Sequence, residues 1–370
     1  MLLLTSLITA ALIQPDALTT IGGALTRISE NQQAKRGWTK DGNSWLLLPP
    51  STPWASLHFV GGAGFGSAPE ICYDALLQTL VRRLGVAVVA TPYDVATDHW
   101  ALSNAVHDEF DRALLVCRER SGLSANAPTY RLGHSLGAKL LVLGALGEEE
   151  QGLLTSGDEE RPPAAEEQAD DDAASKLGLL AFNNFDLSDS AELAAAFLAR
   201  LQGGDEARMA DNVKSAFDMA KGFASMAGID FGVELEVTPN PQELEDAVAK
   251  RYKAQQTTMW KFTGDALDSS DGLLNALPAG TDVARSTLDE GARGHLTPVA
   301  FRLEAADIDP TLAMLLGSNQ GFTFGDAEDV QPLCDEICEW MWPKGMARRP
   351  VLSSSGEEEL EEVVVEVVED

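Results

Sequence analysis

The sequence predicts an α/β fold: a mostly parallel sheet with helices on both faces and a helical cap inserted late in the chain. Short apolar runs of strand length alternate with longer amphipathic stretches, which is the order of consecutive βαβ units. Runs such as 86–91 (VAVVAT) are apolar throughout, as expected of strands covered on both faces. The chain has 370 residues, 45% of them hydrophobic, which suffices for one large domain of this kind or two ordinary ones.

The individual elements follow from periodicity and from Pro and Gly stop signals. Short apolar runs predict strands at 44–48, 55–60, 86–91, 129–132, 177–182, 257–262 and 281–286. Apolar residues that recur about every three to four positions predict helices at 70–84, 98–121, 136–146, 270–277 and 326–341. Residues 188–256 are mainly helical, with Pro239 and Pro241 opening the last helix, and they interrupt the alternation. We therefore expect 188–256 to form a cap above the sheet.

The composition excludes two classes of partner. The chain carries 27 Lys and Arg against 58 Asp and Glu, a net charge of −31. A field of this sign repels phosphate backbones and anionic membranes, so nucleic-acid binding is not expected. No apolar run reaches the roughly 20 residues that a membrane-spanning helix needs. Four cysteines are too few for a disulfide framework in a chain of this length.

The two ends and one internal segment differ from the rest of the chain. Residues 147–176 carry 11 acidic and 2 basic side chains, and residues 356–370 carry 8 acidic and no basic ones. We expect the first to be a disordered acidic loop and 346–370 a disordered acidic tail, whose charge would also suit a basic protein partner. Residues 1–40, which begin with an apolar run, are predicted to be a leader, either a targeting segment or a first helix packed on the domain. The domain itself is expected at 41–345.

The strongest chemical signal is the G-x-S-x-G sequence Gly133-His134-Ser135-Leu136-Gly137, between a predicted strand and a predicted helix. Such a motif forms a sharp turn that exposes a serine hydroxyl, and its glycines remove side chains that would collide with neighbouring backbone. The helix N-terminus at the serine favours a developing negative charge. The motif predicts a nucleophile at Ser135; the alternative is an ordinary glycine-bounded turn with a capping serine.

A serine hydroxyl needs a base to take its proton, and the base needs an orienting acid. In the α/β-hydrolase fold, the acid and then the histidine follow the serine along the chain. His295 is the only histidine downstream of Ser135, and the neighbouring His134 should point away from the hydroxyl. Asp265, directly after the penultimate strand, is the first choice of acid, and Asp268, one turn later, is the alternative. The one that is not used is expected to cap the following helix.

Acyl transfer also needs N–H groups that bind the negatively charged oxygen of the intermediate. Leu136 N–H, directly after the serine, is one candidate, and the loop 61–66 (GGAGFG) supplies Gly62 or Ala63 as the second. A phosphate-binding loop is the competing interpretation, but a G-x-G-x-x-G pattern starting at Gly62 requires a glycine where Ser67 stands. No cofactor and no metal are expected.

Several segments together resemble a family of α/β-hydrolase-like proteins of unknown function from cyanobacteria and plastids. These segments are LHFVGG at 57–62, ATPY at 90–93, GHSLGAKL at 133–140, FNNF at 182–185, FTGDALD at 262–268 and HLTP at 295–298. The resemblance implies a triad of Ser135, Asp265 or Asp268, and His295. It also implies a plastid location, with the cytoplasm as the alternative. The acidic loop and tail depart from the family pattern, and the family has no settled substrate.

Five further residues each allow two interpretations. Cys334 and Cys338, four apart on a predicted helix, are interpreted as small buried residues rather than metal ligands. Lys139, one turn beyond the serine, is expected at a solvated helix position, with contact to an anionic substrate as the alternative. Asn183 and Asn184, at a strand end, are equally consistent with lining a pocket and with holding a turn.

Two functions fit these residues. The first is a serine hydrolase that cleaves an ester, thioester or amide of a small or lipid-like substrate beneath the cap. In it, Ser135 attacks, His295 carries the proton, and Asp265 or Asp268 orients the histidine. The second is a non-catalytic protein of the same fold that acts as a binding or assembly factor in the plastid. The first function is preferred.

Overall fold

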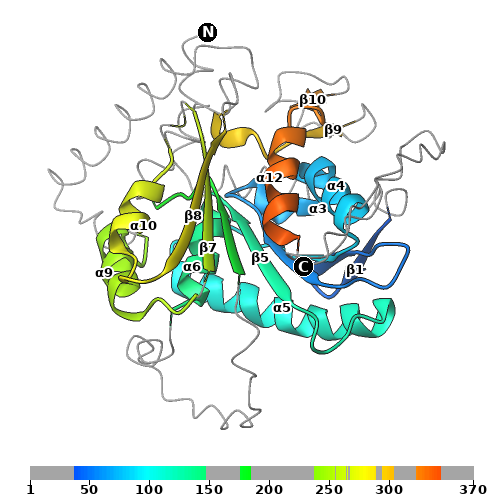
Figure 1. The fold of residues 1–370 in the computed structure, drawn as a ribbon, viewed down its shortest axis with the longest axis horizontal. Coiled ribbons are helices and arrows are strands. Elements are labelled where there is room, and N and C mark those ends of the chain that lie inside the picture. The colour runs from blue at the N-terminus through cyan, green and yellow to red at the C-terminus, as the bar shows by residue number, and fades with distance from the viewer. Residues whose placement is uncertain are drawn as a thin grey trace, which may run out of the picture.

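An eight-stranded sheet forms the centre of the molecule, with helices on both of its faces (Figure 1). The computed structural model describes residues 37–146, 176–184, 237–254, 256–263, 265, 267–288, 294–303 and 322–342. The expected leader, acidic loop and acidic tail lie outside the described residues, apart from residues 37–40 and 176 at their edges.

The strand order identifies the fold. The strands of the sheet are β1 (Trp38–Asp41), β2 (Ser44–Leu47), β3 (Ser56–Val60), β4 (Ala87–Ala90), β5 (Thr129–His134), β6 (Lys176–Leu180), β7 (Gln256–Phe262) and β8 (Asp282–Leu288). They lie in the order β1-β2-β4-β3-β5-β6-β7-β8, and β2 is antiparallel to both neighbours while the pairs from β4 to β8 are parallel. This is the arrangement of the α/β-hydrolase fold, as predicted.

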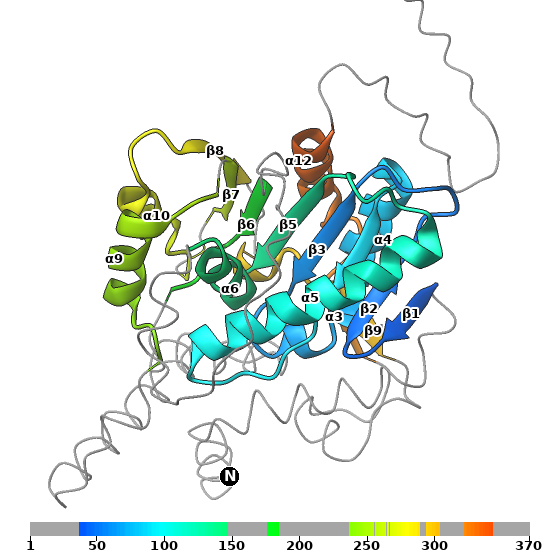
Figure 2. The same ribbon diagram turned by 90° about the horizontal axis from the view of Figure 1, so that it is seen from below.

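Helices from different parts of the chain cover the two faces of the sheet. The helices are α3 (Pro69–Cys72), α4 (Asp74–Leu84), α5 (His99–Ser121), α6 (Leu136–Gly144), α9 (Pro241–Arg251), α10 (Ser270–Ala276) and α12 (Gln331–Met341). The first two and α12 pack in one apolar cluster, and the other four pack against the opposite face (Figure 2). None of the helices in the described ranges combines the length and apolar character needed to cross a lipid bilayer.

Side chains of the central strand β3 pack against the helices on both faces of the sheet. Its side chains alternate between the faces because successive residues of a pleated strand point to opposite sides. Leu57 and Phe59 belong to the cluster with α4 and α12. His58 points to the other face, where its ring stacks on Phe110 of α5 with centroids 4.0 Å apart. All five residues of β3 are buried, including the polar Ser56 and His58.

The structure corrects three details of the predicted elements. The helix predicted at 70–84 is two helices, α3 and α4, because Tyr73 leaves the helical conformation between them. The last helix starts at Gln331 rather than at 326, after a turn in which Glu328 N–H donates to Asp326 Oδ1 at 2.9 Å. Three short strands were not predicted: β1 and an antiparallel pair, β9 (Phe301–Leu303) and β10 (Phe322–Phe324). Each has only three or four residues, too few to show a clear alternation of apolar positions.

The described part of the expected cap is a crossover helix. Helix α9 connects β6 to β7 and packs beside α10, and its Leu244, Ala247 and Val248 are buried in the same cluster as α6. It begins with a capping box in which Asn240 and Glu243 each accept from the backbone N–H of the other. The rest of the expected cap, residues 188–236 and 255, lies outside the described residues.

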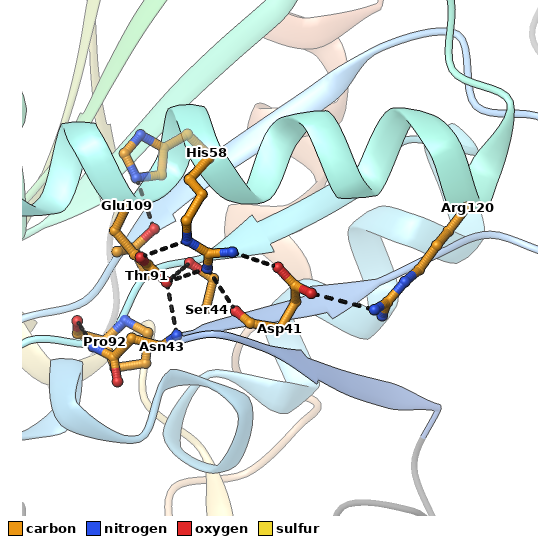
Figure 3. A network of polar contacts seen from close by, with 9 residues as sticks. Asp41, Asn43, Ser44, His58, Thr91, Pro92, Glu109 and Arg120 are labelled. Atoms are coloured by element: carbon orange, nitrogen blue, oxygen red, sulfur yellow. Dashed lines mark hydrogen bonds and ion pairs between the residues drawn. The ribbon is translucent and has the colours of Figure 1, made fainter.

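A polar network fastens the β1–β2 turn to α5. Arg112 of α5 donates from Nη1 to Asp41 Oδ2 at 2.8 Å and from Nη2 to Glu109 Oε1 at 2.6 Å. Arg120 reaches the other oxygen of Asp41 at 3.2 Å, and Asn43 N–H donates to Glu109 Oε1 at 2.7 Å. Figure 3 shows Asp41 beside Arg120, and Glu109 close to Asn43 of the turn. The antiparallel edge of the sheet is thereby tied to a helix 65 or more residues away in sequence.

We expect Arg112→Met to lower the free energy of unfolding by about 1 kcal/mol, because a partly exposed ion-pair network contributes at about that level. Urea unfolding measures the change. Arg118→Met is a matched control on the same helix, since the Arg118 side chain donates to a backbone carbonyl, that of Ala125. The Arg112 effect should shrink in about 1 M salt, whereas the Arg118 effect should not. Equal salt dependence of the two variants would contradict this account.

Candidate active site

Ser135 lies at the sharp turn between β5 and α6. Its backbone has φ 56° and ψ −121°, a strained conformation that a non-glycine residue rarely adopts. A Cβ at Gly133 would lie 2.6 Å from Ala138 Cα, and a Cβ at Gly137 would overlap the carbonyl oxygens of Val60 and Gly61. Both glycines of the motif are therefore required by contacts with backbone, as the sequence argument supposes.

The structure brings Ser135, His295 and Asp265 together from three separate segments. His295 Nε2 lies 2.8 Å from Ser135 Oγ, and His295 Nδ1 lies 2.9 Å from Asp265 Oδ2. A carboxylate only accepts, so Nδ1 carries the proton and the lone pair of Nε2 faces the hydroxyl. The hydroxyl can therefore donate to an imidazole whose orientation is fixed by Asp265.

Short local bonds fix the two partners of the serine. His295 sits in a 3-10 turn (Gly294–Leu296) after β8, closed by Thr297 N–H donating to Gly294 O at 3.1 Å. Asp265 follows β7, and its second oxygen, Oδ1, accepts from Leu267 N–H at 2.9 Å. The Asp265 carboxylate is buried, so both of its oxygens are held by the protein rather than by bulk water.

Asp268 does not contact His295. Its carboxylate accepts from Ser270 N–H at 2.9 Å and from Ser270 Oγ at 3.0 Å, and Lys261 Nζ lies 3.4 Å away. These bonds place Asp268 at the start of α10, as expected for the aspartate that is not used on the histidine. Burial raises the pKa of Asp268, with the bonds from Ser270 opposing that shift.

The loop after β3 lies against the serine turn. A Cβ at Gly62 would be 3.1 Å from Ser135 Cβ, so a side chain there would have to displace a neighbour slightly. The prediction for Gly62 as an oxyanion donor is corrected, because its N–H donates to Tyr73 Oη at 2.8 Å. Within the described residues, the N–H groups of Ala63 and Leu136 have no hydrogen-bond acceptor, which leaves these two predicted donors available.

His134 points away from the hydroxyl, as expected, and both of its ring nitrogens have other partners. Nδ1 lies 2.8 Å from Tyr73 Oη, and Nε2 lies 2.8 Å from the backbone oxygen of His295. Burial and, to a smaller extent, the adjacent His295 lower the pKa of His134 to about 3. His134 is therefore neutral at pH 7 and has no free nitrogen with which to serve as a base.

Two buried tyrosines near the site escaped the sequence argument. Tyr73 bonds to Gly62 and His134, and Tyr93 Oη donates to Gly61 O at 2.8 Å. Tyr73 lies in a segment whose apolar spacing predicts only a helix, and no chemical motif marks it. Tyr93 is part of the ATPY segment at 90–93, and its place in the family resemblance was the one sequence signal that could have drawn attention to it.

Lys139 is not solvated, contrary to expectation. Its side chain is 1% exposed, and Nζ donates to Pro239 O at 3.0 Å. Burial lowers the pKa of Lys139 to about 8, and Glu243 partly opposes the shift. The lysine therefore ties the helix after the serine to the segment that enters α9.

The remaining candidates hold structure. Asn183 Nδ2 donates to Leu267 O at 3.5 Å and Asn184 Nδ2 to Pro241 O at 3.0 Å, so both asparagines connect loops at this edge of the sheet. Cys334 is buried in the cluster with α4 and Cys338 packs against that cluster. In the described part of the chain, no three His, Cys, Asp or Glu side chains gather as a metal site would require.

We expect Gly137→Ala to destabilise the fold by more than about 2 kcal/mol, because the added methyl group meets backbone that cannot move aside. Gly122→Ala is the matched control: Gly122 has φ 70°, but its Cβ would meet only Thr52 at 3.8 Å. The control should cost about 1 kcal/mol, from backbone strain alone. Urea unfolding distinguishes the two, and a Gly137 variant no less stable than the control would refute the steric argument.

The lowered pKa of His134 predicts a pH dependence of stability. The unfolded histidine binds a proton below about pH 6.5, whereas the folded one does not until about pH 3, so folding is disfavoured as the pH falls. In His134→Gln this contribution disappears. We expect the difference in unfolding free energy between wild type and variant to change by about 1.4 kcal/mol per pH unit below about pH 6. A difference that stays constant between about pH 7 and pH 5 would contradict the assignment.

Comparisons with known proteins place the chain near a family of unknown function and several solved structures. No curated protein matches the sequence at a significant level. Among solved structures, the chain is similar to a hormone-sensitive lipase from a metagenome library, with 15% identity, 89% of this chain and 97% of that chain covered, and a TM-score of 0.41. A lipase-esterase related protein from Clostridium acetobutylicum matches with 9% identity, coverage of 81% and 100%, and a TM-score of 0.39. A soluble variant of monoglyceride lipase from Saccharomyces cerevisiae matches with 10% identity, coverage of 83% and 94%, and a TM-score of 0.39.

The TM-scores and sequence identities of these matches are low, so we assign the fold from the strand order described above. Residues 37–153, less than half of the chain, match the family described as "Protein of unknown function (DUF1350)". The matched range begins with β1 and includes the glycine-rich loop, Ser135 and α6.

Proposed function

We propose that this protein is a serine hydrolase that cleaves an ester, thioester or amide of a small or lipid-like substrate. The observation that carries the proposal is the continuous hydrogen-bonded series from Ser135 Oγ to His295 to Asp265, with separations of 2.8 and 2.9 Å, on a strained turn at a helix N-terminus. An ordinary capping serine requires neither the strain nor the paired histidine.

The proposed first half-reaction forms an acyl-serine. Ser135 Oγ attacks the substrate carbonyl carbon while His295 Nε2 takes the hydroxyl proton, and the carbonyl electron pair moves to oxygen. The N–H groups of Ala63 and Leu136 stabilise that oxyanion. The intermediate then collapses, the bond to the leaving group breaks, and His295 returns the proton to the departing alcohol, thiol or amine.

The second half-reaction releases the acid. Water attacks the acyl carbon as His295 accepts its proton, and the same N–H groups stabilise the second oxyanion. Collapse regenerates the Ser135 hydroxyl with the proton from His295. Asp265 keeps Nδ1 protonated and stabilises the positive charge that develops on the imidazole in both halves.

The alternative, a non-catalytic binding or assembly factor with a basic partner, was based on the two acidic segments. Those segments lie outside the described residues, and the geometry around Ser135 gives this alternative no support. A plastid location remains part of our proposal on the sequence resemblance alone. A fluorescent fusion of the full chain, viewed in cells that contain plastids, tests it: cytosolic fluorescence would contradict it.

A fluorophosphonate probe tests the proposed nucleophile. We expect the wild type to be labelled and Ser135→Ala to remain unlabelled, because only an activated serine reacts at an appreciable rate. Asp265→Asn and Asp268→Asn form a matched pair. The first should slow labelling by about ten-thousandfold, through loss of the correct histidine tautomer. The second should change both the rate and the stability little, because an asparagine side-chain oxygen can still accept from Ser270 N–H.

Two outcomes would contradict the proposal. Equal labelling of wild type and Ser135→Ala would show that the hydroxyl is not activated. Equal rates for the two asparagine variants would show that Asp265 has no special relation to the base.

A further inference from the structure

A chain of buried hydrogen bonds joins the loop after β3 to the loop that carries His295. Gly62 N–H contacts Tyr73 Oη at 2.8 Å, Tyr73 Oη contacts His134 Nδ1 at 2.8 Å, and His134 Nε2 contacts His295 O at 2.8 Å. All four residues are buried. This series of hydrogen bonds includes His134, the residue directly before the proposed nucleophile Ser135.

The partners fix the direction of every bond. The backbone carbonyl of His295 only accepts, so His134 Nε2 carries a proton and donates. The buried ring is neutral, so Nδ1 then has a lone pair and accepts from the Tyr73 hydroxyl. Gly62 N–H can only donate, so the Tyr73 oxygen accepts that hydrogen bond. The Tyr73 hydroxyl in turn donates its hydrogen bond to His134 Nδ1. Each donor has an acceptor and no group is left over, which is the favourable state for a buried polar network.

The first end of the chain orients the peptide groups of the proposed oxyanion loop. Gly62 N–H and Gly61 C=O belong to one peptide group, and Tyr73 and Tyr93 hold it from its two sides. The next peptide group is held by Gly66 N–H, which donates to Gly62 O at 2.6 Å. In a trans peptide the N–H points opposite to the C=O, so this bond directs Ala63 N–H away from Gly66.

The other end of the chain holds the backbone of the proposed base. The imidazoles of His134 and His295 have centroids 5.2 Å apart, and the bond from Nε2 goes to the His295 main chain rather than to its ring. The ring nitrogens of His295 remain with Ser135 and Asp265. His134 therefore restrains where the His295 backbone lies without competing for its imidazole.

We infer that His134 is a positioning residue that holds the His295 loop, and through Tyr73 the oxyanion loop, in register with Ser135. The inference deepens the proposed function and rests on it for its catalytic consequence. The hydrogen-bond chain itself is a property of the folded protein and can be tested without turnover.

Two substitutions of His134 distinguish its hydrogen bond to His295 from its hydrogen bond to Tyr73. The side-chain nitrogen of glutamine can take the place of His134 Nε2 and donate to His295 O, whereas the oxygen of asparagine can take the place of Nδ1 and accept from Tyr73. We expect His134→Asn to slow fluorophosphonate labelling by about tenfold or more relative to His134→Gln, because it leaves the buried carbonyl of His295 without a donor. With p-nitrophenyl butyrate the loss should appear in kcat, with KM little changed.

The loop can also be followed without activity. In His134→Asn we expect faster amide hydrogen exchange at Leu296 and Thr297 than in His134→Gln, because the restraint on the turn is lost. His58→Asn is the matched control: His58 is an equally buried histidine, bonded to Thr91 Oγ1 at 3.2 Å on the side facing α5. The control should change neither the labelling rate nor the exchange of these two amides.

Labelling rates and amide exchange that are the same in the two His134 variants would overturn the inference, whether both are high or both are low. Failure of the proposed function has a different signature. If the wild type is not labelled at all, the hydrolase proposal fails, and the exchange comparison still decides whether His134 restrains the His295 loop.

Discussion

The close approach of the α6 N-terminus to the end of β3 is the constraint on which the site depends. There is no room at Gly137 for any side chain, because the carbonyl groups of Val60 and Gly61 occupy the space. At the same place the serine turn lies against the loop after β3, and Ser135 has its strained backbone conformation. Packing of backbone against backbone thus sets the Ser135 turn and the start of α6 beside the glycine-rich loop after β3.

Around this point the protein places neutral, fully bonded groups. Burial lowers the pKa of His134 and raises that of Tyr73 and Tyr93, so all three remain uncharged near pH 7. Within the described residues, the ring nitrogens of His295 bond to Ser135 and Asp265, so Asp265 places a negative charge directly beside the imidazole. A positive charge on His295 is therefore stabilised chiefly by one carboxylate in a region of low dielectric.

Much of this arrangement could be predicted because strong local rules apply. Apolar runs located the strands from β2 to β8, and the G-x-S-x-G sequence located the serine turn because steric contacts with the chain's own backbone demand those glycines. The order of residues after the serine narrowed the histidine to His295. It left two aspartates three residues apart, and only the side-chain contacts separate Asp265 from the capping Asp268.

The failures concern partners that are distant in sequence. Tyr73 takes the N–H of Gly62 because the helix predicted at 70–84 breaks there and turns the phenol inward. Lys139 is buried because the segment at Pro239, 100 residues later, covers it. Periodicity cannot reveal either contact, since it reports which face of an element is apolar and not which polar group lies opposite.

The crystal structure of the protein after reaction with diethyl p-nitrophenyl phosphate tests the central claim most directly. Our account predicts a phosphoryl group on Ser135 Oγ with its unesterified oxygen about 2.7–3.1 Å from the N–H groups of both Ala63 and Leu136. It also predicts that Gly62 N–H stays with Tyr73. Attachment at another residue, or an adduct whose oxygen points away from these two N–H groups, would contradict it.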